Sequence, residues 1–333
     1  MGSSTSRALL DKVYIRGGLH AQAIEFGAYW DAIMVHPLVD VEVTLDLSTT
    51  ANVERMQSAE FAWTAVATAK RPPARQGAAG AVIGDDWFVV AGERASFEYS
   101  DVWKLSFATM EWSFVDATNM LPARHDHSVV AHGDKLVVLG GRGPAPLGDC
   151  WMFDVKTSTW SEIATPEGMA ARFGHSAVMV GSSMYVYGGF IEGSGLTDDV
   201  FALNLDTLEW TYVGPNDAIY SEPKGFLTAP ESAMLFPQDI PASRFSHTMV
   251  AGKDGRSFYV VGGAGGDALN KALSDAWRFD TVLRQWSVVH AGSDLAVYDA
   301  MAVANGDSAY LFGGIVGASK TASADLYRIT LEA

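Results

Sequence analysis

The sequence predicts an all-β fold, a six-bladed β-propeller with four-stranded antiparallel blades. Three observations lead to this prediction: a motif that recurs at intervals of 48 and 49 residues, strand-favouring Val, Tyr, Phe and Trp within it, and glycines at tight turns between its apolar runs. Of the 333 residues, 48% are apolar, which is enough for a large core. We expect one domain over residues 8–333, with a flexible segment at 1–7.

The first part of the motif is an Arg-x-x-His opening. It occurs as Arg124 to His127, Arg172 to His175 and Arg244 to His247, with a weaker copy at Arg75. Successive openings lie 49, 48 and 72 residues apart, and the long interval holds an insertion at 214–243. A residue that recurs at one position in several blades usually serves the repeat. These arginines and histidines are therefore expected to bond loops or pack between strands.

The second part is an apolar run that ends in a glycine pair. Its six copies are YIRGG ending at Gly18, a degraded FVVAGE after Phe88, and runs ending at Gly141, Gly189, Gly263 and Gly314. Glycine pairs permit close backbone approach at a strand end. Between this strand and the opening strand lie turns that favour positive φ, at Gly84-Asp85, Gly133-Asp134 and Asn305-Gly306. The two strands are therefore expected to form a hairpin.

The third part is an Asp-x-aromatic strand followed by a tryptophan. Four copies span eleven positions each and end at Trp112, Trp160, Trp210 and Trp286. A four-stranded unit of this size cannot bury both faces alone, but blades stacked radially cover one another. We expect each tryptophan to fill the wide outer gap between two blades.

These residues resemble the kelch repeat family, whose blades carry the same glycine pair and a similarly spaced tryptophan. The resemblance covers roughly residues 8 to 331. It implies a propeller but is less specific for function, because kelch propellers serve as adaptors, cytoskeletal binders and occasional enzymes.

Both ends of the repeat look incomplete. The first blade has the strand ending at Gly18, Val41–Leu47 and a displaced Trp63, and its innermost strand is missing. The last blade has strands at 299–303, 309–314 and 325–331, but its tryptophan would fall at position 336, beyond Ala333. In kelch propellers one terminus commonly completes the blade of the other. Here two neighbouring blades are expected to hold three strands each.

One face of the propeller is expected to carry the binding function. Because strands alternate in direction, the loops after the glycine pairs and those entering the Arg strands emerge on the same face, where loop length varies most. The long segments 19–39 and 214–243 are prominent there. Aromatic and arginine residues suit a binding surface, and the candidates are Phe26, Tyr29, Trp30, Arg94, Phe97, Tyr99, Arg142 and Phe190. A role for the first three in capping the open end of the propeller is an equal alternative.

The composition indicates which classes of partner and which cellular compartment to expect. A net charge of −16 without a basic stripe disfavours nucleic acid. The single Cys150 and the absence of a signal-like apolar run suit a cytoplasmic protein, expected to be monomeric. The start MGSSTS fits the N-myristoylation pattern at Gly2, which gives only weak membrane association.

Catalytic and metal chemistry find little support in the sequence, and no cofactor is expected. His125 and His127 stand two apart, as ligands on one side of a strand do, but no further ligand cluster accompanies them. Galactose-oxidase-like chemistry needs a Cys crosslinked to a Tyr, and Cys150 lies within a strand. The E-x-x-x-D-x-x-x-H iron motif of specifier proteins does not occur.

The sequence therefore favours a protein-binding kelch scaffold or adaptor. A small-molecule alternative stays open: a sugar-acid mutarotase, another isomerase or a lyase at the channel mouth, where arginines such as Arg124 and Arg172 can hold a carboxylate. Such an enzyme requires a polar pocket with perturbed acid and base groups around them.

Overall fold

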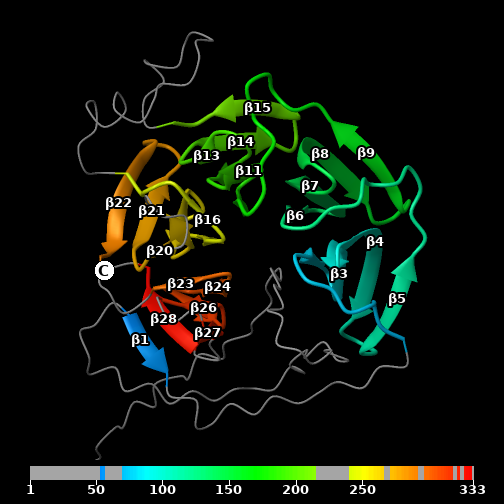
Figure 1. Cartoon of the computed structure of the whole chain (residues 1–333), viewed down its shortest axis with the longest axis horizontal. Helices are drawn as coiled ribbons and strands as arrows, with labels where there is room; N and C mark the ends of the chain where they lie inside the picture. The colour runs from blue at the N-terminus through cyan, green and yellow to red at the C-terminus, as the bar shows by residue number, and fades with distance from the viewer. Residues whose placement is uncertain are drawn as a thin grey trace, which may run out of the picture.

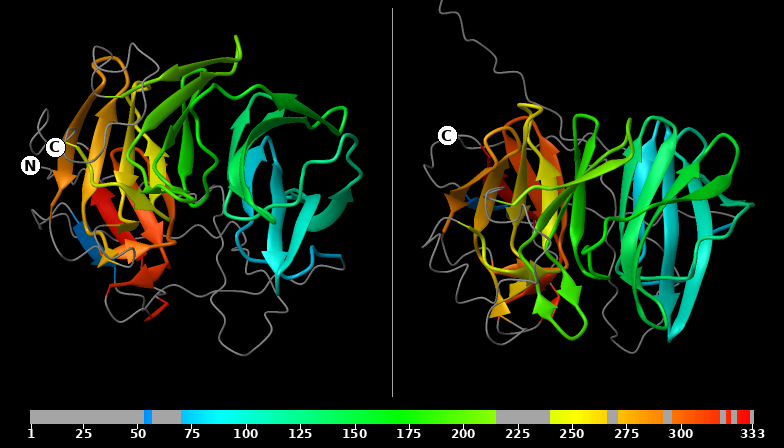
Figure 2. Two further views of the ribbon diagram at one scale, coloured as in Figure 1. Left: turned by 45° about the horizontal axis from the view of Figure 1, so that its top comes forward. Right: turned by 90° about the horizontal axis from the view of Figure 1, so that it is seen from above.

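The chain forms a β-propeller. The computed structural model describes residues 53–56, 70–214, 240–265, 271–291, 296–317, 321–322 and 326–331. Every regular element in these ranges is a β-strand, and the strands form five four-stranded antiparallel sheets arranged in a ring (Figure 1). In side view the strands run between two faces of the ring (Figure 2). Within the described ranges no helix is long and apolar enough to cross a membrane.

Each of the five sheets is one blade, and we letter them A to E in chain order. Blade A contains β2 (Ala79–Ile83), β3 (Asp86–Arg94), β4 (Phe97–Ser106) and β5 (Glu111–Val115). Blade B contains β6 (Ser128–His132), β7 (Lys135–Arg142), β8 (Pro146–Asp154) and β9 (Thr159–Ile163). Blade C contains β10 (Ser176–Val180), β11 (Ser183–Tyr187), β14 (Val200–Asn204) and β15 (Glu209–Tyr212). Blade D contains β17 (Thr248–Ala251), β18 (Ser257–Val261), β21 (Ala276–Asp280) and β22 (Gln285–His290). Blade E contains β24 (Met301–Asn305), β25 (Ser308–Phe312), β28 (Leu326–Thr330) and β1 (Val53–Met56).

Small sheets extend blades C, D and E beyond their glycine pairs. They consist of β12 (Phe190–Ile191) with β13 (Gly195–Leu196), of β16 (Arg244–Phe245) with β19 (Ala264–Gly265) and β20 (Lys271–Ala272), and of β23 (Val297–Tyr298) with β26 (Ile315–Val316) and β27 (Thr321–Ala322). In blades A and B the ends of β3–β4 and β7–β8 form the corresponding hairpins. In each blade the strand with the glycine pair thus leads into a short hairpin. The residues just before the first strand of the blade pair with this hairpin.

The predicted turns are present in three blades. Gly84, Gly133 and Gly306 all have positive φ, between 55° and 60°, and each joins the first two strands of its blade. The opening strand and the glycine-pair strand are therefore hairpin partners, as the turn chemistry predicts.

The glycine pairs mark the point where each second strand bends away from its blade. Gly140 and Gly141 have φ of 57° and 102°, and the register of β7 against β8 shifts there. In the degraded copy Ala91 stands in place of the first glycine and still adopts φ of 53°. An added Cβ at Gly141 would lie 2.8 Å from the Cβ of His127, so only glycine fits without displacement of the backbone.

The hydrophobic core is divided among the gaps between neighbouring blades. One cluster joins Phe88 and Val90 of blade A to Leu136 of blade B, and Trp160 lies in it with 1% exposure. Trp286 packs in the same way between blades C and D. Trp210 contacts the cluster between blades B and C, and Trp112 packs against Trp87 in blade A. The motif tryptophans therefore occupy the flanks of the blades.

The closure of the ring differs from the prediction. Blade E has four strands, because β1 pairs antiparallel with β28, from Val53 against Ile329 to Met56 against Leu326 (Figure 1). The expectation of a three-stranded last blade is wrong. The local motif could not reveal this strand, since its sequence VERM carries neither glycine pair nor tryptophan. The predicted first blade and the N-terminal segment lie outside the described residues, as does most of the 214–243 insertion.

Candidate functional site

A set of ion pairs with buried arginines recurs in blades A to D, and we call it the collar. It consists of the pairs Arg75–Asp101, Arg124–Asp149, Arg172–Asp199 and Arg244–Asp275. In each pair both guanidinium Nη atoms donate to the two carboxylate oxygens; for Arg124 and Asp149 both distances are 2.8 Å. The arginine side chains are at most 3% exposed. The motif Arg and the motif Asp therefore join the segment that opens a blade to the region of its third strand.

Further hydrogen bonds complete the collar. Arg124 also donates to the carbonyl oxygen of Gly140, and Trp151 donates its indole N–H to Asp149. Burial alone would raise the pKa of Asp149, but the hydrogen bonds and charge of Arg124 outweigh burial, and the pKa lies below its usual value. Arg124 and Arg172 have their guanidinium forks occupied by aspartates, so neither offers its fork to a substrate carboxylate.

The motif histidines lie buried behind the glycine pairs. His127, His175 and His247 are at most 5% exposed. The Nε2 atom of His175 lies 3.0 Å from the hydroxyl oxygen of Ser128, so this ring connects blades B and C. His125 is in a different environment, because Asp126 between the two histidines has φ of 54° and interrupts the strand. His125 and His127 therefore do not stand on one side of a strand as their spacing suggests.

The residue after each motif Arg, together with Tyr298 at the equivalent position of blade E, lies at one end of the propeller, and we call this set of positions the rim. It comprises five residues and their hairpin partners: Gln76 with Glu93, His125 with Arg142, Phe173 with Phe190, Phe245 with Ala264, and Tyr298 with Ile315. The next residue in each blade has positive φ and joins the neighbouring blade through the backbone; the N–H of Asp126, for example, donates to the carbonyl oxygen of Gly77 at 2.8 Å. In blades A to E the rim therefore stands on a row of backbone hydrogen bonds that runs from Gly77 to Asp299.

The rim changes chemistry around the ring. In blades C, D and E its members are largely aromatic or aliphatic. The rings of Phe173 and Phe190 are 5.3 Å apart, and the guanidinium of Arg142 lies over Phe173 at 5.3 Å. In blades A and B the rim is polar, and its Glu93 and His125 lie beside Glu98, which pairs with Glu93 in the β3–β4 hairpin. One side of the rim thus offers π surface and the other carboxylates and an imidazole.

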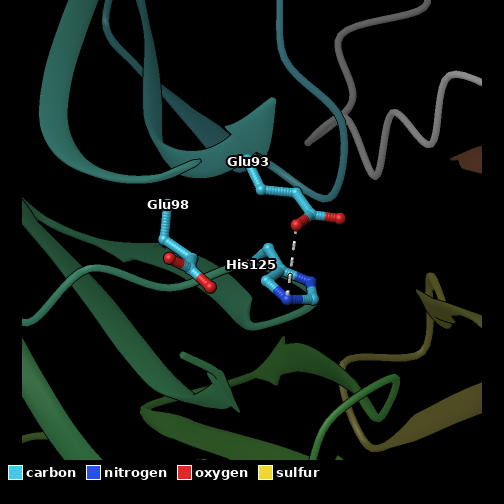
Figure 3. A group of neighbouring side chains, drawn as sticks. All are labelled: Glu93, Glu98 and His125. Carbon is cyan, nitrogen blue, oxygen red and sulfur yellow. Dashed lines mark ion pairs between the residues drawn. The ribbon is translucent and has the colours of Figure 1, made fainter. Parts of the chain in front are cut away.

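Figure 3 shows the polar group of Glu93, Glu98 and His125, and neighbouring side chains hold two of its members. The Nε2 atom of His125 lies 3.8 Å from Glu93, and its Nδ1 atom lies 3.0 Å from Asp126. Gln76 donates to the other oxygen of Glu93 at 2.8 Å. Burial alone would lower the pKa of His125, but the hydrogen bond and charge of Asp126, together with the charge of Glu93, raise it above its usual value.

A second carboxylate near Asp126 is unusually basic. Burial raises the pKa of Asp299 to about 6, a hydrogen bond with Ser246 opposes the rise, and the charge of Asp126 adds to it. Asp299 occupies the position in blade E that Asp126 occupies in blade B, and its N–H donates to the carbonyl oxygen of Ser246. Two blades therefore place negative charge on the inner side of the rim.

The predicted contact residues fall into three groups. Phe26, Tyr29 and Trp30 lie outside the described residues. Arg94, Phe97 and Tyr99 share the β3–β4 hairpin, where the ring of Phe97 is 64% exposed and lies 5.2 Å from Tyr99. Arg142 and Phe190 belong to the rim.

Sequence reasoning missed Glu98 and several members of the rim: Gln76, Glu93, Phe173, Phe245 and Tyr298. One signal in the sequence could have found four of the rim positions. The residue after the motif Arg is Gln, His, Phe and Phe in four successive copies, so it varies where its neighbour repeats.

Comparison with protein families identifies the repeat. The model of the KLHDC2/KLHL20/DRC7 Kelch-repeats domain matches residues 11–141 and 119–236, which together make up more than half of the chain. The chain belongs to the kelch-repeat family. No curated protein matches it in a direct sequence comparison. Kelch membership agrees with the all-β propeller and makes protein interaction the general expectation for this kelch propeller.

Proposed function

We propose that this kelch propeller is a protein-binding scaffold, that it has six blades, and that its partner docks on the rim and on the hairpins around it. The observation that carries the proposal is the contrast in chemistry between two adjacent positions. The motif Arg is the same in four blades and its side chain is buried, whereas the residue after it is Gln, His or Phe and lies at the end of the ring. Variation on a fixed frame is typical of a recognition surface.

The composition of this surface suits a protein partner. Phe97 exposes 64% of its surface, Arg142 is exposed, and Phe173 and Phe190 lie beside it. Aromatic and arginine side chains are the commonest energetic centres of protein interfaces. The rim backbone is bonded from blade to blade, so little ordering of the scaffold is required on binding.

The enzyme alternative lacks a comparable observation. It requires free arginines at the channel mouth, but Arg124 and Arg172 are bound in the collar. Cys150 is fully buried, and burial raises the pKa of its thiol, which disfavours a reactive thiolate.

Affinity capture with matched phenylalanine variants tests the proposal. Phe97→Ala, on the β3–β4 hairpin, is expected to reduce capture of native partners at least tenfold, as Tyr29→Ala with Trp30→Ala should. Phe114→Ala is the control, because Phe114 is 56% exposed but lies on the outer strand β5. Equal capture by the Phe97→Ala variant and the unaltered protein, or a loss confined to Phe114→Ala, contradicts the choice of this face.

A further inference from the structure

We propose that Glu93, Glu98 and His125 form a binding site for a divalent transition-metal ion, with Zn²⁺ the ion that best suits the ligands. The three residues come from the end of β3, the start of β4 and the opening of blade B. Their ligand atoms all lie within 4.8 Å of one another, and Figure 3 shows the side chains gathered at one place. An imidazole and carboxylates are ligands that Zn²⁺ accepts.

The separation of the ligand atoms supports a shared ion. The Nε2 atom of His125 lies 3.8 Å from Oε2 of Glu93, which is too long for a hydrogen bond. Two ligands on one tetrahedral Zn²⁺, each bound at about 2.0 to 2.2 Å, stand about 3.4 Å apart. A small movement of either side chain therefore brings both atoms to bonding distance of one ion.

Hydrogen bonds outside the three ligands orient two of them. His125 faces Asp126 with its Nδ1 atom at 3.0 Å, so a proton on Nδ1 leaves the lone pair of Nε2 directed toward Glu93. Gln76 donates to Oε1 of Glu93, which leaves Oε2 available as a ligand. A carboxylate behind a histidine is the common support of metal-binding histidines, because it fixes the tautomer and the ring orientation.

The charge balance also favours a cation. Glu93, Glu98 and Asp126 bring three carboxylates around the imidazole of His125, and Arg142 is a cation near them. A divalent ion would offset most of this negative charge. Three protein ligands leave a fourth tetrahedral position open, and the side chains of His125 and Glu93 are 13% and 19% exposed. Water or a partner side chain can occupy that position.

Metal titration of the full chain tests the inference directly. After chelator treatment and dialysis, calorimetric titration with Zn²⁺ should show one site per chain, and Co²⁺ should give visible absorption typical of a tetrahedral site. His125→Ala should abolish the Co²⁺ spectrum, and Glu98→Gln should weaken Zn²⁺ binding at least tenfold. Asp126→Asn should weaken it by about ten- to a hundredfold, because the support of the histidine is altered.

His132→Ala is the matched control. His132 also pairs with a carboxylate, Asp206, at 3.2 Å, but it lies on β6 outside the proposed site. Its variant should bind Zn²⁺ as the unaltered protein does. Thermal unfolding without metal checks that each variant is folded. Absence of a one-to-one site in the unaltered protein, or equal binding by a folded His125→Ala variant, would overturn the inference. Because the probe is the metal alone, either result is independent of the proposed partner binding.

Discussion

The collar and the rim are adjacent in every motif copy and yet differ in almost every property. The collar repeats the same Arg and Asp in four blades, and its arginines are buried. The rim carries a different residue in nearly every blade and changes from polar to aromatic around the ring. The comparison indicates that the residues repeated from blade to blade maintain the fold. The positions that vary between blades form the surface for which we propose partner binding.

The largest expected effect on stability comes from replacing an arginine of the collar, and an arginine of the rim provides the comparison. Arg124→Ala should lower the free energy of unfolding by about 3–5 kcal/mol, because it leaves Asp149 charged and half-buried without its partner. Arg142→Ala, on the exposed rim, should change it by less than about 0.5 kcal/mol. Urea unfolding measures both. Similar losses for the two variants would remove the distinction between collar and rim.

The second comparison concerns glycines. Gly189→Ala should cost about 2–4 kcal/mol, because φ is 102° and the new Cβ would lie 2.9 Å from the Cβ of His175. Gly181→Ala should cost only about 1 kcal/mol, because φ is 59° and nothing lies within 4 Å. The same unfolding measurement applies. A smaller loss for Gly189→Ala than for Gly181→Ala would show that the glycine pair is not required for packing.

The third comparison varies the pH and concerns Asp299, which lies in the row of backbone hydrogen bonds beneath the rim. Because burial raises its folded-state pKa to about 6, above the value of an unfolded aspartate, the folded state binds the proton more tightly. Its contribution to stability is therefore greatest at low pH and is lost as pH rises through about 6. Asp299→Asn should stabilise the protein by about 1–3 kcal/mol at pH 7.5. Thermal unfolding at several pH values should show this gain shrinking toward pH 4, and a gain independent of pH would contradict the assignment.

The smallest expected effect on stability is at the β3–β4 hairpin beside the rim. Phe97→Ala should change the free energy of unfolding by less than about 0.5 kcal/mol, because the side chain is 64% exposed, even though partner capture falls. Chemical unfolding of the purified variant supplies this value. A loss above 1 kcal/mol would mean that Phe97 supports the fold, and reduced capture would then not report on docking.

The sequence predicted the part of the structure that depends on local, repeated chemistry. Positive φ at Gly84 and Gly133 and the packing of Trp160 between blades follow from turn geometry and spacing. The strand β1 could not be predicted, since its partner β28 lies far along the chain and neither carries the full motif. The group of Glu93, Glu98 and His125 was missed for a related reason: it joins two blades, and no spacing within one copy connects them.

The pairing of β1 with β28 has a consequence for folding during synthesis. About 270 residues separate Met56 from Leu326, and a ribosome adds about 5–20 residues per second. The first strand therefore waits on the order of tens of seconds for its partner. Throughout that interval the nascent chain carries an unpaired strand edge, which a chaperone or an early contact within the chain must protect from aggregation.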